Sequence, residues 1–213
     1  MGQEGISEPT YEAYLASLLG GDRRRCRDLL TRLLDGGLPV RVAYLDLLQR
    51  ALYRVGLLWE RNRISVATEH VATAVTEDLL NVALPYLRCA PPVGRLAVVA
   101  GVSPEQHRVG AKMVADTFDQ HGWDSVYVGA STPPGELLRL VRELRPDTVA
   151  LSLTMFFNLG PLEAMIGSLR SAFPDQEIVV GGQGLDRLGP ALAARARVTH
   201  LRTLAELDNH LAS

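Results

Sequence analysis

The chain has 213 residues, of which 47% are hydrophobic and 22% are charged, and its formal net charge is −2. This composition is typical of a globular protein and excludes disordered and collagen-like chains. Residues 1–92 carry 11 basic and 11 acidic side chains, and residues 93–213 carry 11 and 13. Neither half therefore has the basic surface of a nucleic-acid-binding domain, and we expect no direct binding to nucleic acid.

Two isolated cysteines, Cys26 and Cys89, argue against a disulfide framework and against a cysteine-based zinc site. The N-terminal residues lack the apolar core of a signal peptide. No apolar run approaches the roughly 18 residues that a membrane span needs. We therefore expect a soluble, cytoplasmic protein with no membrane segment.

The first ninety residues show helical spacing of their apolar side chains and no strand-like pattern. Four segments have this spacing, at about 8–19, 22–35, 40–59 and 65–88. Gly20-Gly21 and Gly36-Gly37 should end the first two helices, and Pro85 should shorten the fourth. Four helices with short connections predict a helical bundle over residues 8–88.

A linker over residues 89–95 separates this region from a different pattern. Short apolar runs typical of buried strands occur at 96–100, 126–128, 148–151 and 178–180. Helical spacing occurs at about 105–121, 134–144, 159–172 and 203–211. Strands that alternate with helices predict an α/β fold, here a Rossmann-like (flavodoxin-like) parallel sheet over residues 96–213 with helices on both faces.

Three of the expected strand ends carry unusual residues, and ligands bind at the strand ends of an open parallel sheet. The first strand is followed by Glu105-Gln106-His107-Arg108-Val109-Gly110, the third by Ser152-Leu153-Thr154 and the fourth by Gly181-Gly182. The gaps between these motifs are 41 and 26 residues. This arrangement resembles the cobalamin-binding domain family, whose motifs D-x-H-x-x-G, S-x-L or S-x-T, and G-G occur in this order at matching separations.

The resemblance implies that His107 is the lower axial ligand of a cobalamin cobalt, a transition metal that accepts imidazole. Glu105 stands where the broad family has Asp, and it would hold the second ring nitrogen of His107. Gly110 would open the following helix without a side chain that blocks the corrin.

The same resemblance places the displaced nucleotide tail of the cofactor beside the other two motifs. Ser152 and Thr154 would offer hydroxyls at the mouth of its slot, and Gly181 and Gly182 would let the backbone approach it closely. Alternatively, the hydroxyls are ordinary strand-end residues and the glycines form an ordinary turn.

The helical region contains Trp59, then nine residues, then Glu69-His70. This W-x9-E-H pattern resembles the light-sensing adenosylcobalamin proteins of the CarH type, in which it covers the upper ligand. A Trp offers an apolar platform for an adenosyl group, and a carboxylate can accept hydrogen bonds from its polar edge. The alternatives are that Trp59 is a bundle core residue and that Glu69-His70 is a polar pair on a helix surface.

Two features depart from the CarH-type pattern. Those regulators carry an N-terminal DNA-binding domain that has no counterpart here, so control of transcription would require a partner protein. A His also follows their Trp directly, whereas Glu60 holds that position in this sequence. His70 is then the nearby imidazole that could reach cobalt after the adenosyl group is lost.

These resemblances favour a cobalamin-binding sensory protein, which binds adenosylcobalamin base-off with His107 below the cobalt. Light would cause a conformational or oligomeric change that acts on a partner protein or on a homo-oligomer. Methylcobalamin and hydroxocobalamin are alternative forms of the cofactor. The alternative functions are a corrinoid carrier for methyl transfer and an antirepressor or adaptor without photochemistry. We expect no independent enzyme, since no acid–base pair, P-loop or dinucleotide fingerprint occurs.

Overall fold

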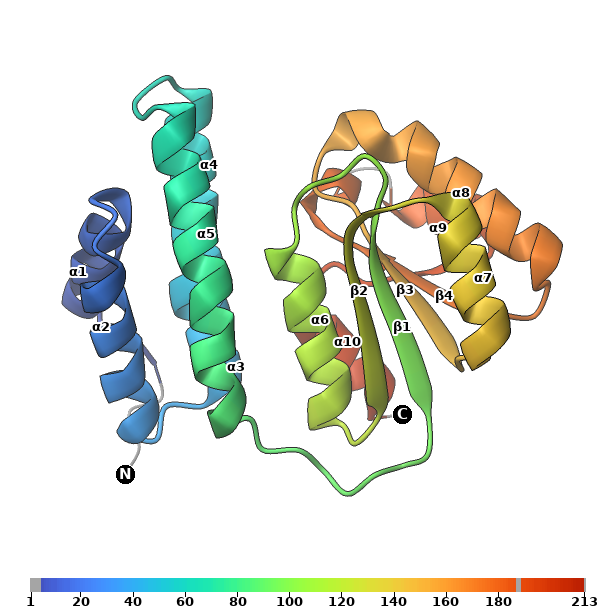
Figure 1. The fold of residues 1–213 in the computed structure, drawn as a ribbon, viewed down its shortest axis with the longest axis horizontal. Helices are drawn as coiled ribbons and strands as arrows, with labels where there is room; N and C mark the ends of the chain where they lie inside the picture. Colours follow the sequence, from blue (N-terminus) through green and yellow to red (C-terminus); the bar gives the residue numbers. More distant parts are fainter. Residues whose placement is uncertain (1–4, 187–188, 213) are drawn as a thin grey trace. The chain divides into compact units, whose positions relative to one another are not determined.

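A computed structural model describes residues 5–186 and 189–212, and the chain divides into two folded units, Met1–Leu87 and Arg88–Ser213 (Figure 1). The first unit is helical and the second contains a parallel sheet, so the predicted fold class is confirmed. Among the described residues, no helix has the length and apolar character of a membrane span.

The first unit consists of α1 (Glu8–Leu19), α2 (Arg23–Asp35), α3 (Val40–Val42), η1 (Ala43–Gln49), α4 (Arg50–Glu60), α5 (Val66–Ala83) and η2 (Leu84–Tyr86). Side chains of Ser7, Asp22 and Ser65 cap α1, α2 and α5 by accepting a backbone N–H of the first turn. As predicted, Pro85 lies where the last helix ends, inside the 3-10 turn η2.

The π-helical segment η1 is the main departure from the expected bundle. It joins α3 and α4 into one helical stretch, and its wider turns change which side chains face the interior. The core of this unit contains fully buried side chains from four parts of the chain, among them Tyr14, Leu18, Leu30, Leu47, Leu48, Leu79 and Leu80.

The second unit consists of β1 (Leu96–Val102), α6 (Val109–Gln120), β2 (Asp124–Thr132), α7 (Pro134–Leu144), β3 (Thr148–Ser152), η3 (Phe156–Asn158), α8 (Leu159–Ala172), β4 (Glu177–Gly181), η4 (Gln183–Leu185), α9 (Gly189–Ala196), β5 (Thr199–His200) and α10 (Leu204–Leu211). The strands pair in parallel in the order β2-β1-β3-β4-β5, which is the flavodoxin-like order.

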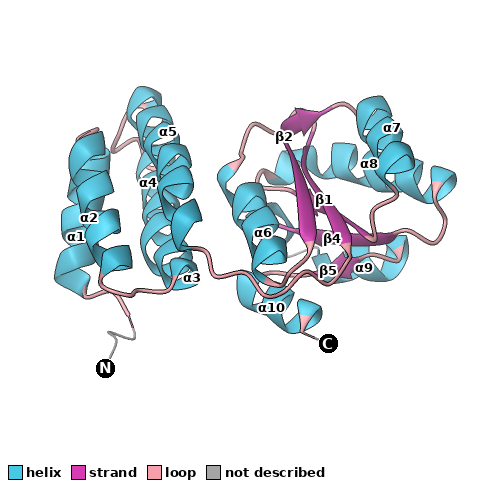
Figure 2. Ribbon diagram, turned by 60° about the horizontal axis from the view of Figure 1, so that its bottom comes forward, coloured by secondary structure: helices cyan, strands magenta, loops and turns pink. Residues whose placement is uncertain are grey.

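Helices cover both faces of this sheet (Figure 2). Helices α7, α8 and α9 pack on one face, where strand residues such as Val98, Leu151 and Val180 form the core. Helix α6 packs on the other face, and α10 packs against α6.

Three details differ from the sequence-based expectation. Helix α6 begins at Val109 instead of near residue 105, so Ser103–Arg108 form a loop after β1. Strand β5 and helix α9 were not predicted. The later start of α6 places His107 in a loop, where a ligand can approach it.

Candidate functional site

The carboxyl edge of the sheet has a topological switch point between β1 and β3. The chain leaves β1 for α6 on one face and leaves β3 for α8 on the other, and ligands of this fold bind at such a point. The two loops at this point are residues 103–108 and 153–158. The first contains Glu105 and His107, and the second contains Thr154.

Glu105 and His107 form a hydrogen-bonded pair in the first loop. The Glu105 carboxylate is 1% exposed and its Oε1 contacts Nδ1 of His107, whose side chain is 46% exposed. A carboxylate at Nδ1 favours the tautomer with the proton on that nitrogen, so that Nε2 carries the lone pair. The imidazole is thereby prepared as a metal ligand.

The other carboxylate oxygen of Glu105 bonds to the second loop. Oε2 accepts hydrogen bonds from the backbone N–H of Thr154 at 3.0 Å, the backbone N–H of Met155 at 3.1 Å and Nδ2 of Asn158 at 3.4 Å. Burial acts to raise the pKa of Glu105, but the hydrogen bonds from His107, Met155 and Thr154 outweigh it and lower the pKa below its ordinary value. Glu105 is therefore ionised at neutral pH and links the two loops.

Ser152 belongs to a row of small residues across three strands. Gly101, Ser152 and Gly181 are paired in register on β1, β3 and β4. The preceding residues on β3 and β4, Leu151 and Val180, belong to the core beneath α7, α8 and α9. Since side chains alternate along a strand, the row faces the opposite side of the sheet. No side chain larger than a hydroxymethyl group occurs in it.

The two glycines of the G-G motif are required by the packing of the chain itself. Gly182 has φ +103°, and a Cβ atom there would lie 2.2 Å from the carbonyl oxygen of Leu153. A Cβ atom at Gly181 would lie 2.7 Å from the carbonyl oxygen of Leu201. The alternative that the two glycines form a turn thus has a clear structural basis. Their close approach to a nucleotide tail stays a prediction.

Gly110 borders open space, whereas Thr154 contacts Glu105 through its backbone. A Cβ atom at Gly110 would meet no atom within 4 Å, so the fold gives no internal reason for a glycine at the start of α6. This open space fits an external group beside the His107 loop. Thr154 contributes its backbone N–H to Glu105, a role that the prediction of a ligand-binding hydroxyl did not include.

The W-x9-E-H residues all lie in the first unit. Trp59 lies near the C-terminal end of α4 and is 41% exposed, so its interpretation as a bundle core residue is wrong. Glu69, in the first turn of α5, bonds Nδ1 of His70 at 2.6 Å and accepts the hydroxyl of Thr73 at 2.9 Å. Glu69 and His70 therefore do form a polar pair on a helix, and any contact with a cofactor stays a prediction.

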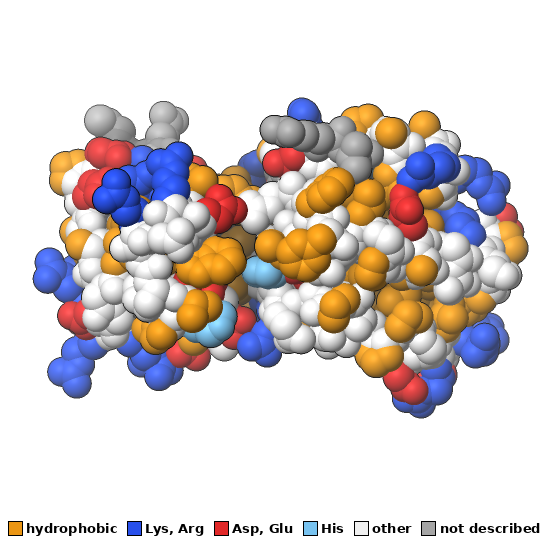
Figure 3. Space-filling model, turned by 90° about the horizontal axis from the view of Figure 1, so that it is seen from above, with side chains coloured by type: hydrophobic (Ala, Val, Ile, Leu, Met, Phe, Trp, Pro, Cys, Tyr) orange, Lys and Arg blue, Asp and Glu red, His pale blue; other side chains and the backbone are white. Residues whose placement is uncertain are grey.

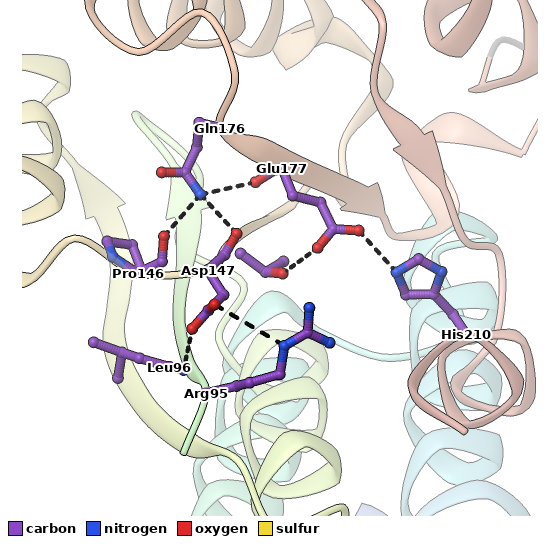
Figure 4. A network of polar contacts seen from close by, with 8 residues as sticks. Arg95, Leu96, Pro146, Asp147, Gln176, Glu177 and His210 are labelled. Atoms are coloured by element: carbon purple, nitrogen blue, oxygen red, sulfur yellow. Dashed lines mark hydrogen bonds and ion pairs between the residues drawn. The ribbon is translucent and has the colours of Figure 1, made fainter. Parts of the chain in front are cut away.

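The opposite edge of the sheet holds a polar network that stabilises the fold (Figure 4). Glu177 accepts hydrogen bonds from Thr148 at 2.5 Å and contacts Nε2 of His210 at 3.1 Å. His121, at the C-terminal end of α6, contacts Asp208 of α10 at 3.1 Å. These two histidines attach α10 to the sheet unit and lie apart from the switch point.

The space-filling view in Figure 3 looks down on the molecule of Figure 1. On the sheet unit it shows hydrophobic side chains over the middle of this face, with charged side chains mainly toward the rim. The second loop contributes to the exposed hydrophobic surface of the unit, because Phe156 and Phe157 are 61% and 72% exposed.

A helical unit followed by a flavodoxin-like sheet, with a carboxylate-held histidine after β1, defines the class of two-part corrinoid-binding proteins. Two family models, each described as a B12 binding domain, match residues 10–83 and 95–197. The chain belongs to the B12-binding domain family, and the cofactor that this family indicates is a cobalamin.

Two curated relatives from Myxococcus xanthus are the HTH-type transcriptional repressors CarH and CarA. CarH is 31% identical over 170 residues, which are 79% of this chain and 55% of CarH. CarA is 31% identical over 160 residues, which are 74% of this chain and 54% of CarA. The chain thus spans about half the length of the curated relatives it matches.

A solved structure, the monomethylamine corrinoid protein of Methanosarcina barkeri, has the same fold. The TM-score is 0.84 over 96% of this chain and 98% of that protein, at 13% sequence identity. At this low identity the likeness supports the fold and carries no conclusion about activity.

The residues at the switch point fit a cobalamin. Its macrocycle already surrounds the cobalt, so the protein needs to supply one imidazole, and the Glu105 contact favours the tautomer of His107 that coordination requires. Within the described residues, no three His, Cys, Asp or Glu side chains cluster as a self-contained metal site. The open space at Gly110 is compatible with a bulky planar ligand.

Proposed function

We propose that this protein is a sensory module that binds adenosylcobalamin base-off, with Nε2 of His107 as the lower ligand of cobalt. The observation that carries this proposal is the buried Glu105 carboxylate, which fixes the ring of His107 and is itself held by the loop after β3. Such carboxylate–histidine arrangements orient metal ligands and raise their basicity.

The other predicted residues have supporting roles in this proposal. Gly110 leaves space beside the macrocycle. The hydroxyls of Ser152 and Thr154 would lie beside the nucleotide tail, which would extend toward Gly181 and Gly182. The partly exposed side chain of Ser152 at the end of β3 supports this assignment.

We assign the upper side of the cofactor to Trp59, Glu69 and His70. The exposed indole of Trp59 offers an apolar surface for the adenosyl group, and Glu69 is an acceptor for its hydroxyls or amine. Bound adenosylcobalamin supplies a light-sensitive cobalt–carbon bond. Loss of the adenosyl group would remove its contacts with the helical unit and so change which conformation is favoured.

The signal would act on a partner protein or on self-association in the cytoplasm, and the relatives named as transcriptional repressors favour a regulatory role. A corrinoid carrier for methyl transfer is the second candidate, because the fold matches a corrinoid protein at a TM-score of 0.84. An adaptor without photochemistry is the third.

The test is reconstitution with adenosylcobalamin in the dark, followed by visible spectra and size-exclusion chromatography before and after green light. We expect a stable complex whose spectrum and elution volume both change on illumination. A complex that is inert to light contradicts the light-sensing role. Tighter binding of methylcobalamin, with methyl transfer to an added thiol, would instead support the carrier.

Trp59→Ala distinguishes the two upper-face interpretations. If the indole contacts the adenosyl group, the variant should lose its preference for adenosylcobalamin over hydroxocobalamin while its lower-ligand spectrum is unchanged. Tyr53→Ala is a matched control, because Tyr53 is an aromatic residue of the same helix with a similar exposure of 48%.

A further inference from the structure

The side chain of Asn158 makes an unusual contact for a helix N-cap residue. It is the N-cap residue of α8, where an Asn side chain ordinarily accepts a backbone N–H of the first helical turn. Here it makes no such capping bond. Its amide group instead donates from Nδ2 to Oε2 of Glu105, and the residue is 6% exposed.

The segment that contains Asn158 is not held in place by burial of its apolar side chains. Phe156 and Phe157, the other residues of η3, are 61% and 72% exposed. The described contacts that join this segment to the β1 loop are those that Glu105 accepts from Thr154, Met155 and Asn158. Polar bonds to one buried carboxylate therefore link η3 to the loop that contains His107.

We propose that Asn158 is a positioning residue for His107 and acts through Glu105. The proposal rests on the proposed function, because it takes His107 as the cobalt ligand. Oε1 of Glu105 contacts the imidazole, whereas Oε2 receives two backbone donors and the Asn158 amide. Asn158 is the one of these three donors that a side-chain substitution can remove.

The physical reason is the cost of leaving a buried carboxylate incompletely bonded. Glu105 is 1% exposed, so water cannot readily replace a lost donor at Oε2. Without the Asn158 amide, the carboxylate can rotate about its remaining bonds, and the direction of its contact with Nδ1 changes. A metal ligand needs its ring held within about 0.5 Å of the productive position, so this rotation weakens coordination by Nε2.

Asn158→Asp separates positioning from helix capping. Asp has nearly the same size and is an equally good N-cap residue, but it presents a carboxylate oxygen to Glu105 where Asn presents a donor. We expect the ratio of His-coordinated to uncoordinated cobalamin to fall about tenfold, the lower end of the usual effect of changing a residue that supports a metal ligand. Thermal stability should also fall, because two buried carboxylates then face each other, so the coordination ratio and not the stability is the measure of positioning.

Asn209→Asp is the matched control. Asn209 is an exposed residue of α10 in the same unit, so the substitution adds the same charge away from the Glu105 carboxylate. We expect it to leave the coordination ratio unchanged. Asn158→Ala should lower the ratio in the same direction as Asn158→Asp, because it also removes the donor.

A second measurement needs no cofactor. Nitrogen NMR of the His107 ring, at a pH well above the ordinary histidine pKa, reports which nitrogen carries the proton. We expect a proton on Nδ1 in the unmodified protein and in Asn209→Asp, and a mixture of tautomers in Asn158→Asp.

The outcomes are distinct. Unchanged coordination and an unchanged tautomer in both Asn158 variants would overturn the positioning role, and so would a loss of stability alone. If the unmodified protein binds no cobalamin through histidine, the proposed function fails. The NMR comparison then still decides whether Asn158 orients His107.

Discussion

The contact with Glu105 favours a proton on Nδ1 of His107. Its carboxylate is an acceptor at both oxygens, since Oε1 faces Nδ1 of His107 and Oε2 faces the N–H groups of Thr154 and Met155. An ionised carboxylate can make all of these contacts at once, whereas an amide cannot. In the proposed function, the negative charge of Glu105 is thus the property that would prepare Nε2 for a metal.

Glu105→Gln tests this directly. The amide oxygen can still accept from the two backbone N–H groups, which leaves the NH₂ group against Nδ1 and moves the ring proton to Nε2. We expect cobalamin coordination by His107 to weaken about 10- to 100-fold. A spectral titration measures this, with Glu136→Gln, at an exposed position of α7, as the control. An undiminished His-coordinated spectrum would contradict this role of Glu105.

The sequence allowed the Glu105–His107 pair to be predicted because its members are two residues apart in a recognisable motif. It gave no signal for Asn158, which lies 53 residues from Glu105 and has the ordinary appearance of a helix N-cap. The sequence also did not reveal why Gly181 and Gly182 must be glycines. The close approach of Leu153 to Gly182 and of Leu201 to Gly181 exists only in the folded chain.

At the scale of elements, strongly patterned segments were predictable, whereas the two-residue strand β5 and the weakly patterned helix α9 were not. Helices α7 and α8 lie where the apolar spacing placed them, at Pro134–Leu144 and Leu159–Ala172. Strand β5 has two residues and cannot show an alternation, and α9 is an alanine-rich run with little periodicity. The π-helical turns of η1 depend on packing within the unit, which no local pattern records.

Helix α5 carries Glu69 and His70 in its first turns, so its N-cap matters for the candidate site. The hydroxyl of Ser65 accepts the backbone N–H of Thr68 at 3.1 Å. We expect Ser65→Ala to lower the stability of this helix end by about 1 kcal/mol, because that N–H loses its partner. Hydrogen exchange should then accelerate about fivefold at the first-turn amides of α5.

Ser168→Ala provides the comparison for the Ser65 variant. The Ser168 hydroxyl bonds the carbonyl of Ala164 inside the exposed part of α8, a contact that adds little to helix stability. Equal exchange rates at the start of α5 in Ser65→Ala and in the unmodified protein would show that the cap is dispensable.

At the scale of the whole molecule, each unit contributes one exposed histidine held by a glutamate, His70 with Glu69 and His107 with Glu105. The two family matches cover both units, which supports a cofactor role for each. The near-neutral charge of both halves agrees with a module that senses a cofactor and acts through another protein.

The central claim is that His107 replaces the cofactor's own base as the lower ligand of cobalt. The most direct measurement is electron paramagnetic resonance of the bound cofactor in its Co(II) state, with protein labelled with ¹⁵N at histidine. We predict that the nitrogen splitting changes with the label in the unmodified protein, and that this dependence is lost in His107→Ala. A splitting that is the same with and without the histidine label in the unmodified protein would contradict the account.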